Sequence, residues 1–385
     1  MSDIYLDNNA TTVLDPRVLE AMLPILAEVG NPASVHQAGQ RAKSSVEVAR
    51  RQVAALLGSS PSEVVFTSGS TEANNLALKG VSRQASGRRR IVTVTTEHPS
   101  ILKTLEALAG EGFEIVQVDV DSEGMVQLDS LRLAVNDETL LVSIMAANNE
   151  TGVLSPLEAI AEIAHDNGAL FHSDATQLLV WGGLEVEAIG VDLLSMSGHK
   201  MHGPQGVGAL YVRREVSRRL VATQHGGGQE RGLRSGTLNT AGIVGLGAAA
   251  ELAMLEGPRF ALRVRTLRDE LHHRLQDEAS PVLLNGHLET RLPGTLNLSF
   301  LGADADAIMA GARSVAIATG SACSTGNPGP SHVLTAMGVD AGQAACSLRF
   351  GLSRFTTRED VTTAATLVAA SVSRVRDRSK EAVAL

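Results

Sequence analysis

The sequence has only two cysteines, Cys323 and Cys346, which are too few for a disulfide framework and are typical of a reducing cytoplasm. It also lacks an excess of positive charge: the net charge of −9 argues against a nucleic-acid-binding surface. The N-terminus lacks the basic and then apolar segments of a signal peptide. The most apolar window, residues 241–255, is interrupted by Glu251 and is too short to span a bilayer. We therefore expect a cytoplasmic protein that binds neither nucleic acid nor a membrane.

What is present indicates a soluble α/β enzyme, because 44% of the 385 residues are hydrophobic and 37 are glycine. Between residues 63 and 200, short apolar strands alternate with amphipathic helices, which predicts a mainly parallel sheet with helices on both faces. Past residue 255 the pattern changes to a charged helix over residues 259–278 and an alternating strand over residues 295–300. The composition of residues 256–258 (EGP) suggests a domain boundary there.

Lysine is rare in this chain, so the position of Lys200 is informative. It lies on a glycine-rich turn directly after an apolar strand, residues 191–196, and next to His199. A buried lysine whose pKa is lowered can be a neutral amine that forms a Schiff base with an aldehyde. Taken alone, the same lysine is equally compatible with an ordinary surface turn.

A second motif, residues 67–75 (TSGSTEANN), joins a strand to the start of a helix. The free N–H groups of the first helical turn and the hydroxyls of Ser70 and Thr71 form an anion site, for which phosphate is the obvious ligand. An ordinary Ser/Thr helix cap is the alternative. The motif is neither a Walker loop nor a dinucleotide fingerprint, because the required lysine and glycine spacings are missing.

Five polar side chains of different chemistry follow successive strands of the predicted sheet. In such sheets ligands bind beyond the carboxyl ends of the strands, so we expect these side chains to meet there. They are His98, Asn149, Asp174, Gln177 and Lys200. An amine, a phosphate site and a carboxylate together fit pyridoxal 5′-phosphate (PLP), whose ring nitrogen a carboxylate keeps protonated. Taken singly, Asp174 could be a helix cap and His98 a loop histidine.

At this point the sequence resembles the cysteine desulfurases of the NifS/IscS type, in the class V aminotransferase superfamily. The resemblance covers nearly the whole chain, and the motifs that carry it occur in the family's order. They are residues 5–12 (YLDNNATT), 31–34 (NPAS), 66–72 (FTSGSTE), 97–99 (EHP), 148–152 (NNETG), 172–177 (HSDATQ), 197–200 (SGHK), 226–237 (GGGQERGLRSGT), 320–323 (GSAC) and 349–357 (RFGLSRFTT).

The resemblance implies the aspartate aminotransferase-like fold of PLP-dependent transferases. It places residues 13–256 in a large PLP-binding domain, and residues 1–12 and 257–385 in a smaller α+β domain. It also implies that Lys200 binds the cofactor covalently and moves the Cα proton, and that Asp174 pairs with the ring nitrogen. By the same resemblance, Gln177 binds the phenolic oxygen, and His98 stacks on the ring and assists proton transfer.

The family pattern further assigns ligands to the phosphate and to the substrate. The phosphate ligands are Ser70, Thr71, Ser197 and His199, together with Thr237 from the other subunit of a homodimer. The substrate carboxylate is assigned to Asn149 and Arg349, whose guanidinium fork matches a carboxylate. Considered alone, Arg349 could instead form a structural ion pair. No metal is implied.

Cys323 lies in a segment rich in glycine, proline and small polar residues, for which we expect an exposed, mobile loop. The resemblance makes it the acceptor of sulfur from L-cysteine, with L-alanine as the other product. Iron–sulfur scaffold proteins or other acceptors would then take the sulfur. For Cys346 we expect a buried structural residue. The alternatives are a selenocysteine lyase, another class V PLP enzyme such as an aminotransferase, and a non-catalytic PLP-binding scaffold.

Overall fold

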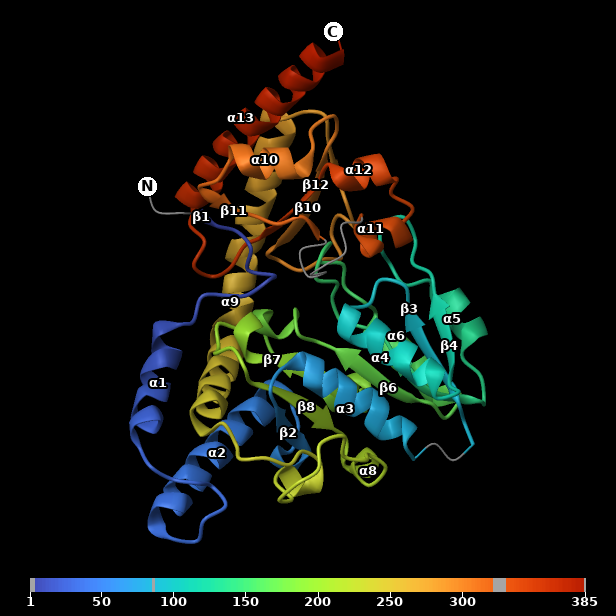
Figure 1. Ribbon diagram of the computed structural model, residues 1–385, viewed down its shortest axis with the longest axis vertical. Coiled ribbons are helices and arrows are strands. Elements are labelled where there is room, and N and C mark those ends of the chain that lie inside the picture. Colours follow the sequence, from blue (N-terminus) through green and yellow to red (C-terminus); the bar gives the residue numbers. More distant parts are fainter. Residues whose placement is uncertain (1–3, 85–86, 321–329, 384–385) are drawn as a thin grey trace.

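The computed structural model describes residues 4–84, 87–320 and 330–383. Its largest sheet has seven strands in the order β2-β8-β7-β6-β5-β3-β4 (Figure 1). In chain order the strands are β2 (Val64–Thr67), β3 (Arg90–Val94), β4 (Glu114–Val118), β5 (Thr139–Ser143), β6 (Leu170–Asp174), β7 (Leu193–Ser197) and β8 (Gly208–Val212). The strands from β7 to β4 are parallel, and β8 is antiparallel to β7 and β2. The predicted α/β class with a mainly parallel sheet is therefore confirmed.

In most strands of the large sheet, successive apolar residues enter different hydrophobic cores, because the sheet is covered on both faces. In β7, Leu194 and Met196 belong to one core and Leu193 to the other. Helices α3 (Ser70–Ser82) and α4 (Pro99–Gly110) supply most of the helical residues in the core of Leu193. The helices around the large sheet are α1 (Pro16–Ala27), α2 (Gln37–Leu56), α3 (Ser70–Ser82), α4 (Pro99–Gly110), α5 (Leu128–Ala134), α6 (Leu157–Asp166), α7 (Val186–Ile189) and α8 (Arg214–Ser217).

The long helix α9 (Thr240–Glu278) runs from the large sheet to the smaller one (Figure 1). The domain boundary expected at residues 256–258 would fall inside α9, because this helix passes through Pro258 without ending. Gly257 allows a close approach here: a Cβ atom would lie 2.7 Å from the carbonyl carbon of Trp181. Tertiary packing therefore overrides the local tendency of proline to end a helix.

Helix α9 is also long and apolar enough to cross a membrane, by length and composition alone. Just over half of its most apolar window is buried inside the protein, against α1 and α2 among others. Its later half packs on α13 (Arg358–Val383). Core helices of soluble proteins meet the same criterion of length and composition.

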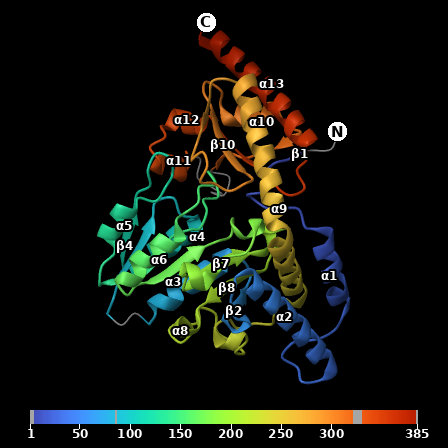
Figure 2. The same ribbon diagram turned by 180° about the vertical axis from the view of Figure 1, so that it is seen from behind.

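A further hydrophobic core surrounds a three-stranded antiparallel sheet in the order β12-β10-β9, which lies at the other end of the molecule from α2 and α8 in both views (Figures 1 and 2). Leu6 joins this core, because the short β1 pairs with β11. The elements here are β1 (Ile4–Tyr5), β9 (Val282–Leu284), β10 (Thr295–Phe300), α10 (Ala305–Gly311), β11 (Val315–Ala316), α11 (His332–Ala336), α12 (Ala341–Ala345) and β12 (Ser347–Gly351). The division of the chain at residues 12 and 256 into domains stays a prediction.

Candidate active site

The turn between β2 and α3 opens into a hollow of about 390 Å³. Gly69 precedes the helix with φ +152°, a backbone conformation that side chains disfavour. Ser70 and Thr71 form the first helical turn and line the hollow. Because the N–H groups of a first turn have no partner within the helix, this end attracts an anion.

The opposite wall of this hollow comes from the end of β7, through Ser197 and His199. Ser197 is buried, and His199 Nδ1 lies 3.1 Å from the hydroxyl of Thr11. Burial, followed by the charge of Lys200, lowers the pKa of His199 to about 4, so this ring is neutral at neutral pH. The four phosphate ligands predicted from this chain's own turns therefore line one hollow.

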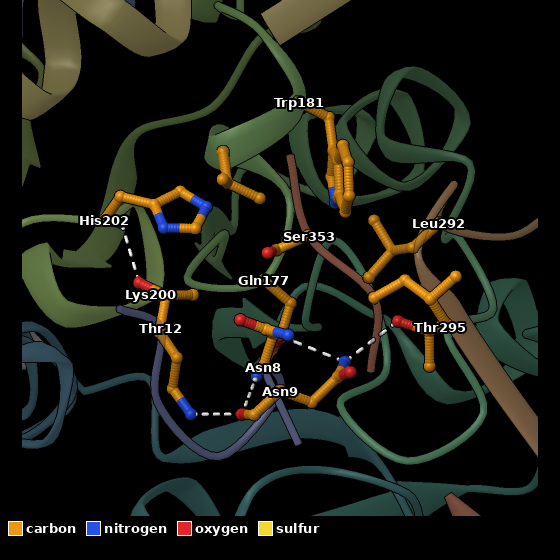
Figure 3. Close-up of a pocket in the computed structure, with 12 residues that line it drawn as sticks. Asn8, Asn9, Thr12, Gln177, Trp181, Lys200, His202, Leu292, Thr295 and Ser353 are labelled. Carbon is orange, nitrogen blue, oxygen red and sulfur yellow. Dashed lines mark hydrogen bonds between the residues drawn. The ribbon is translucent and has the colours of Figure 1, made fainter. Parts of the chain in front are cut away.

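Lys200 ends the short 3₁₀ turn Gly198–Lys200 that follows β7. Its Nζ donates hydrogen bonds to the carbonyl oxygens of Asn9 and Ala10, the latter at 2.7 Å. Figure 3 shows the amine directed at the Asn9 carbonyl. The half-buried lysine is thus held by the N-terminal segment, 190 residues away in sequence.

Gln177 shares the same N-terminal partner. Its Nε2 donates to the Asn9 carbonyl over 3.0 Å, and the Asn9 side-chain amide faces Gln177 Oε1 at 3.4 Å (Figure 3). Asn9 is in turn fixed by a 2.8 Å hydrogen bond to Thr295 Oγ1 on β10. Residues from both sheets therefore meet around Lys200 and Gln177.

Asp174 ends β6 and is buried, with only 7% of its surface exposed. Each carboxylate oxygen accepts one N–H group: Oδ1 from the Thr176 backbone at 3.0 Å and Oδ2 from Asn74 Nδ2 at 2.7 Å. These two partners are neutral donors, and neither is a basic side chain. The Asp174 carboxylate can therefore accept one further N–H group.

His98 caps the N-terminus of α4, where its Nδ1 accepts the backbone N–H of Ser100 at 3.1 Å. Burial is the largest cause that lowers the pKa of His98; the charge of Asp174 acts in the opposite direction. The adjacent Glu97 is fully buried and accepts the backbone N–H groups of Met145 and His98. Burial, and then the charge of Asp174, raise the pKa of Glu97 to about 8.

Arg349 lies on β12 and has no exposed surface. Its Nη1 donates to the carbonyl oxygen of Asn149 at 3.1 Å, and its Nη2 pairs with Asp7 Oδ1 at 2.8 Å. The structure thus brings Arg349 and Asn149 together, but it also places an acidic partner on the guanidinium. Arg349 Nε is buried without a partner among the described residues, so one donor of the fork is unused there.

Two residues considered from the sequence, Thr237 and Cys346, lie outside this cluster, and a third, Cys323, is not described. Thr237 is exposed and does not line the hollow at α3. Cys323 lies outside the described residues. Cys346, expected to be buried, is only partly buried at the end of α12, because it caps that short helix. Within the described ranges, there is no group of three or more His, Cys, Asp or Glu side chains that could hold a metal ion.

Sequence reasoning missed several residues of the site. Asn74 and Ser100 contact predicted site residues, yet each looks like an ordinary helix residue in sequence. Asn9 and Glu97 lie in motifs that carry the family resemblance, but no role was assigned to them. One signal was available: Asn74 interrupts the apolar face of α3, where an amide needs a buried partner.

Comparison with known proteins identifies the family of this chain. Residues 4–363 match the family model "Aminotransferase class-V", so the chain belongs to that family. It is 48% identical to "Cysteine desulfurase IscS" from Anaeromyxobacter dehalogenans, over 98% of this chain and 94% of that protein. Within the class V family, the chain therefore belongs to the cysteine desulfurases.

Solved structures of similar proteins superimpose on nearly the whole chain. One called "NIFS-LIKE PROTEIN" superimposes with a TM-score of 0.90 at 39% identity, covering 96% of this chain and 99% of that one. "SspA in complex with cysteine" gives a TM-score of 0.81 at 33% identity, covering 92% and 99%. These similarities confirm the PLP-dependent transferase fold that the sequence predicted.

Enzymes of this family work with PLP, and the residues present here fit that cofactor. PLP needs an amine for its aldehyde, donors for a phosphate and a carboxylate for its ring nitrogen. Lys200, the first turn of α3 and Asp174 supply these three groups at the ends of neighbouring elements. The donor set is complete without any metal ligand.

Proposed function

We propose that this cysteine desulfurase binds PLP at Lys200 and transfers the sulfur of L-cysteine to Cys323, releasing L-alanine. The observation that carries the proposal is the convergence of an amine, an anion hollow and a carboxylate in a chain of this family. Relatives named cysteine desulfurase and a similar structure that contains cysteine support the choice of substrate.

In this proposal the chain's residues divide the work of holding the cofactor. Ser70, Thr71, Ser197 and His199 bind the phosphate. Gln177 binds the phenolic oxygen. Asp174 keeps a proton on the ring nitrogen, and bound PLP then supplies an electron sink that makes the Cβ–Sγ bond of the amino acid labile.

Lys200 holds the cofactor covalently and moves the proton at the substrate Cα atom. Arg349 and Asn149 bind the substrate carboxylate. Arg349 suits this role because a buried guanidinium with an unused donor gains a charge-assisted hydrogen bond from an entering carboxylate. The carboxylate of Asp7, which pairs with Arg349 in this structure, would then share the guanidinium with the substrate or be displaced by it.

The sulfur-transfer step needs a protein thiol. The Cys323 thiolate attacks the substrate sulfur, the Cβ–Sγ bond breaks, and its electron pair stays with the carbon fragment, which takes up protons to become alanine. Cys323 keeps the sulfur as a persulfide, so one L-cysteine and one thiol give one L-alanine and one persulfide. The persulfide then passes to an acceptor such as an iron–sulfur scaffold protein in the cytoplasm.

The test is a brief pulse of L-cysteine without reductant, followed by mass spectrometry of the peptides and a measurement of alanine. We expect one added sulfur on the peptide that contains Cys323. Cys323→Ala should remain yellow but lose alanine production, whereas Cys346→Ala should keep most of it. Sulfur on Cys346, or undiminished alanine from Cys323→Ala, would show that the nucleophile is another group. Release of alanine from selenocysteine alone would favour a selenocysteine lyase.

A homodimer is part of the same proposal. Helix α1 exposes Leu19, Leu23 and Leu26, which are spaced for one helix face, and Val29 and Val35 follow it in the exposed segment. Such an apolar face supports burial against a second copy, with Thr237 reaching the other subunit's phosphate. Light scattering should give twice the chain mass, and a fully active monomer would contradict the arrangement.

A further inference from the structure

A continuous chain of side-chain hydrogen bonds links Asp174 and His98, two residues to which the family resemblance gives separate roles. Asn74 Nδ2 on α3 lies 2.7 Å from Asp174 Oδ2 and 2.9 Å from Ser100 Oγ. Ser100 Oγ on α4 lies 2.8 Å from His98 Nδ1. The carboxylate at the end of β6 is therefore connected to the imidazole at the start of α4 through one amide and one hydroxyl.

The direction of each hydrogen bond follows from chemistry. An ionised carboxylate only accepts, so the Asn74 amide must turn its NH₂ group toward Asp174. The same NH₂ group then uses its second hydrogen on Ser100 Oγ. This orientation leaves Asn74 Oδ1 buried without a partner among the described residues, in a side chain with no exposed surface. An asparagine kept only for packing would not carry that cost.

The tautomer of His98 follows from the same contacts. The backbone N–H of Ser100 can only donate, and it points at His98 Nδ1 over 3.1 Å. Ser100 Oγ already accepts from Asn74, so its own hydrogen is available for Nδ1 as well. Because Nδ1 receives donors, a neutral His98 ring carries its proton on Nε2.

We propose that Asn74 and Ser100 are positioning residues that connect the Asp174 carboxylate to the His98 imidazole and hold the His98 ring proton on Nε2. The proposal rests on the proposed function, in which Asp174 keeps a proton on the ring nitrogen, and on the family resemblance, which places His98 on the cofactor ring. It makes His98 a hydrogen-bond donor through Nε2. A base at this position would have to take up its proton at Nδ1, where two donors already point, so moving the Cα proton falls to Lys200.

The charged groups around His98 support a neutral ring. Burial lowers the pKa of His98 most; the charge of Asp174 raises it, and interactions with Lys200 and His332 lower it. The neighbouring Glu97, with a pKa of about 8, is largely protonated at neutral pH and adds little negative charge. The hydrogen bonds at Nδ1 therefore act on a ring that its surroundings already keep uncharged.

The test is NMR of the full-length purified protein with ¹⁵N-labelled histidine, in which the His98 signal is identified by its loss in His98→Gln. The wild-type spectrum should show an unprotonated Nδ1 and a protonated Nε2. Ser100→Ala removes the hydroxyl donor to the neutral ring, so the pKa of His98 should rise by about one. Ser100→Thr keeps a hydroxyl and should restore it. The matched control is Ser82→Ala, which removes a buried hydroxyl of α3 outside this chain of contacts.

Asp174 can affect His98 through the hydrogen bonds of Asn74 and Ser100 or directly through space, and the Asn74→Ala variant distinguishes these two effects. It should shift the His98 signal in the wild-type background and have no further effect in Ser100→Ala. A proton on Nδ1 in the wild type, an unchanged pKa in Ser100→Ala, or the same Asn74→Ala effect in both backgrounds would overturn the proposal. These spectra require no turnover. The proposal about Asn74 and Ser100 can therefore be refuted while persulfide still forms on Cys323, or be supported when no persulfide forms.

Discussion

The buried ion pair between Arg50 and Glu230 offers a sharp prediction about the segment that carries Thr237. The guanidinium and carboxylate meet at 2.7 and 2.8 Å through two parallel contacts, and their side chains are only 6% and 1% exposed. Glu230 Oε2 also accepts the Phe66 backbone N–H at 2.8 Å. Glu230 and Arg231 both have positive φ angles, +48° and +58°, so the segment depends on these contacts to keep a strained backbone.

Glu230→Ala removes both contacts and leaves Arg50 charged in the interior with the backbone oxygen of Val64 and the half-exposed Glu47 as partners. Removing one partner of a buried pair costs about 3–5 kcal/mol. The variant also leaves the buried Phe66 N–H without an acceptor, which by itself costs about 1–3 kcal/mol. The two costs cannot simply be added, because Glu230 is the partner lost in both. We therefore expect the free energy of unfolding to fall by at least about 3 kcal/mol.

The assay is urea unfolding followed by circular dichroism. Glu106→Gln is the matched control, because its ion pair with Lys103 is exposed on both sides and should contribute under about 1 kcal/mol. The double variant Arg50→Met, Glu230→Leu should recover most of the loss, since apolar side chains replace both charges. A loss below 1 kcal/mol for Glu230→Ala would refute the reasoning that this pair holds the segment.

Three further predictions concern the site. Borohydride reduction should fix the visible chromophore on Lys200, and a label on another lysine, or a protein that stays colourless with PLP, would contradict this assignment. Arg349→Lys should raise KM for L-cysteine by about tenfold or more, because a lysine cannot form the two-pronged contact with a carboxylate; an unchanged KM would leave Arg349 as a purely structural partner of Asp7. The raised pKa of Glu97 means that the folded state binds one more proton than the unfolded state between about pH 4.5 and 8. Stability should therefore fall as pH rises through that window, by up to about 1.4 kcal/mol per pH unit, and Glu97→Gln should flatten this slope in urea unfolding at several pH values.

The strand-end argument predicted much of the site because it depends on topology more than on detail. Parallel strands bring their carboxyl ends to one edge, so side chains that follow β3, β6 and β7 had to lie near each other. His98, Asp174 and Lys200 do follow those strands, and the first turn of α3 lies on the same edge. The pattern of apolar residues was sufficient to place these elements.

The strand-end argument could not predict contacts between segments that are distant in sequence. Nothing in residues 5–12 indicates that the Asn9 carbonyl meets Lys200 and Gln177, because this requires the relative position of the two sheets. A helix was expected over residues 259–278, but α9 begins at Thr240 and continues through Pro258, where Gly257 packs closely against Trp181. Local sequence therefore predicted the elements, and tertiary packing decided where they end and what lies between them.

Two buried carboxyl groups near the proposed ring site have different surroundings, and this difference assigns their roles. Glu97 accepts two backbone N–H groups but is completely enclosed, and burial together with the charge of Asp174 moves its pKa to about 8. Asp174 accepts one backbone and one side-chain donor and keeps a small exposed surface. When two acidic groups compete for charge, the one in the less polar environment takes the proton. Near neutral pH, Glu97 is therefore largely protonated, and Asp174, held by Thr176 and Asn74, is the carboxyl group we assign to the ring nitrogen.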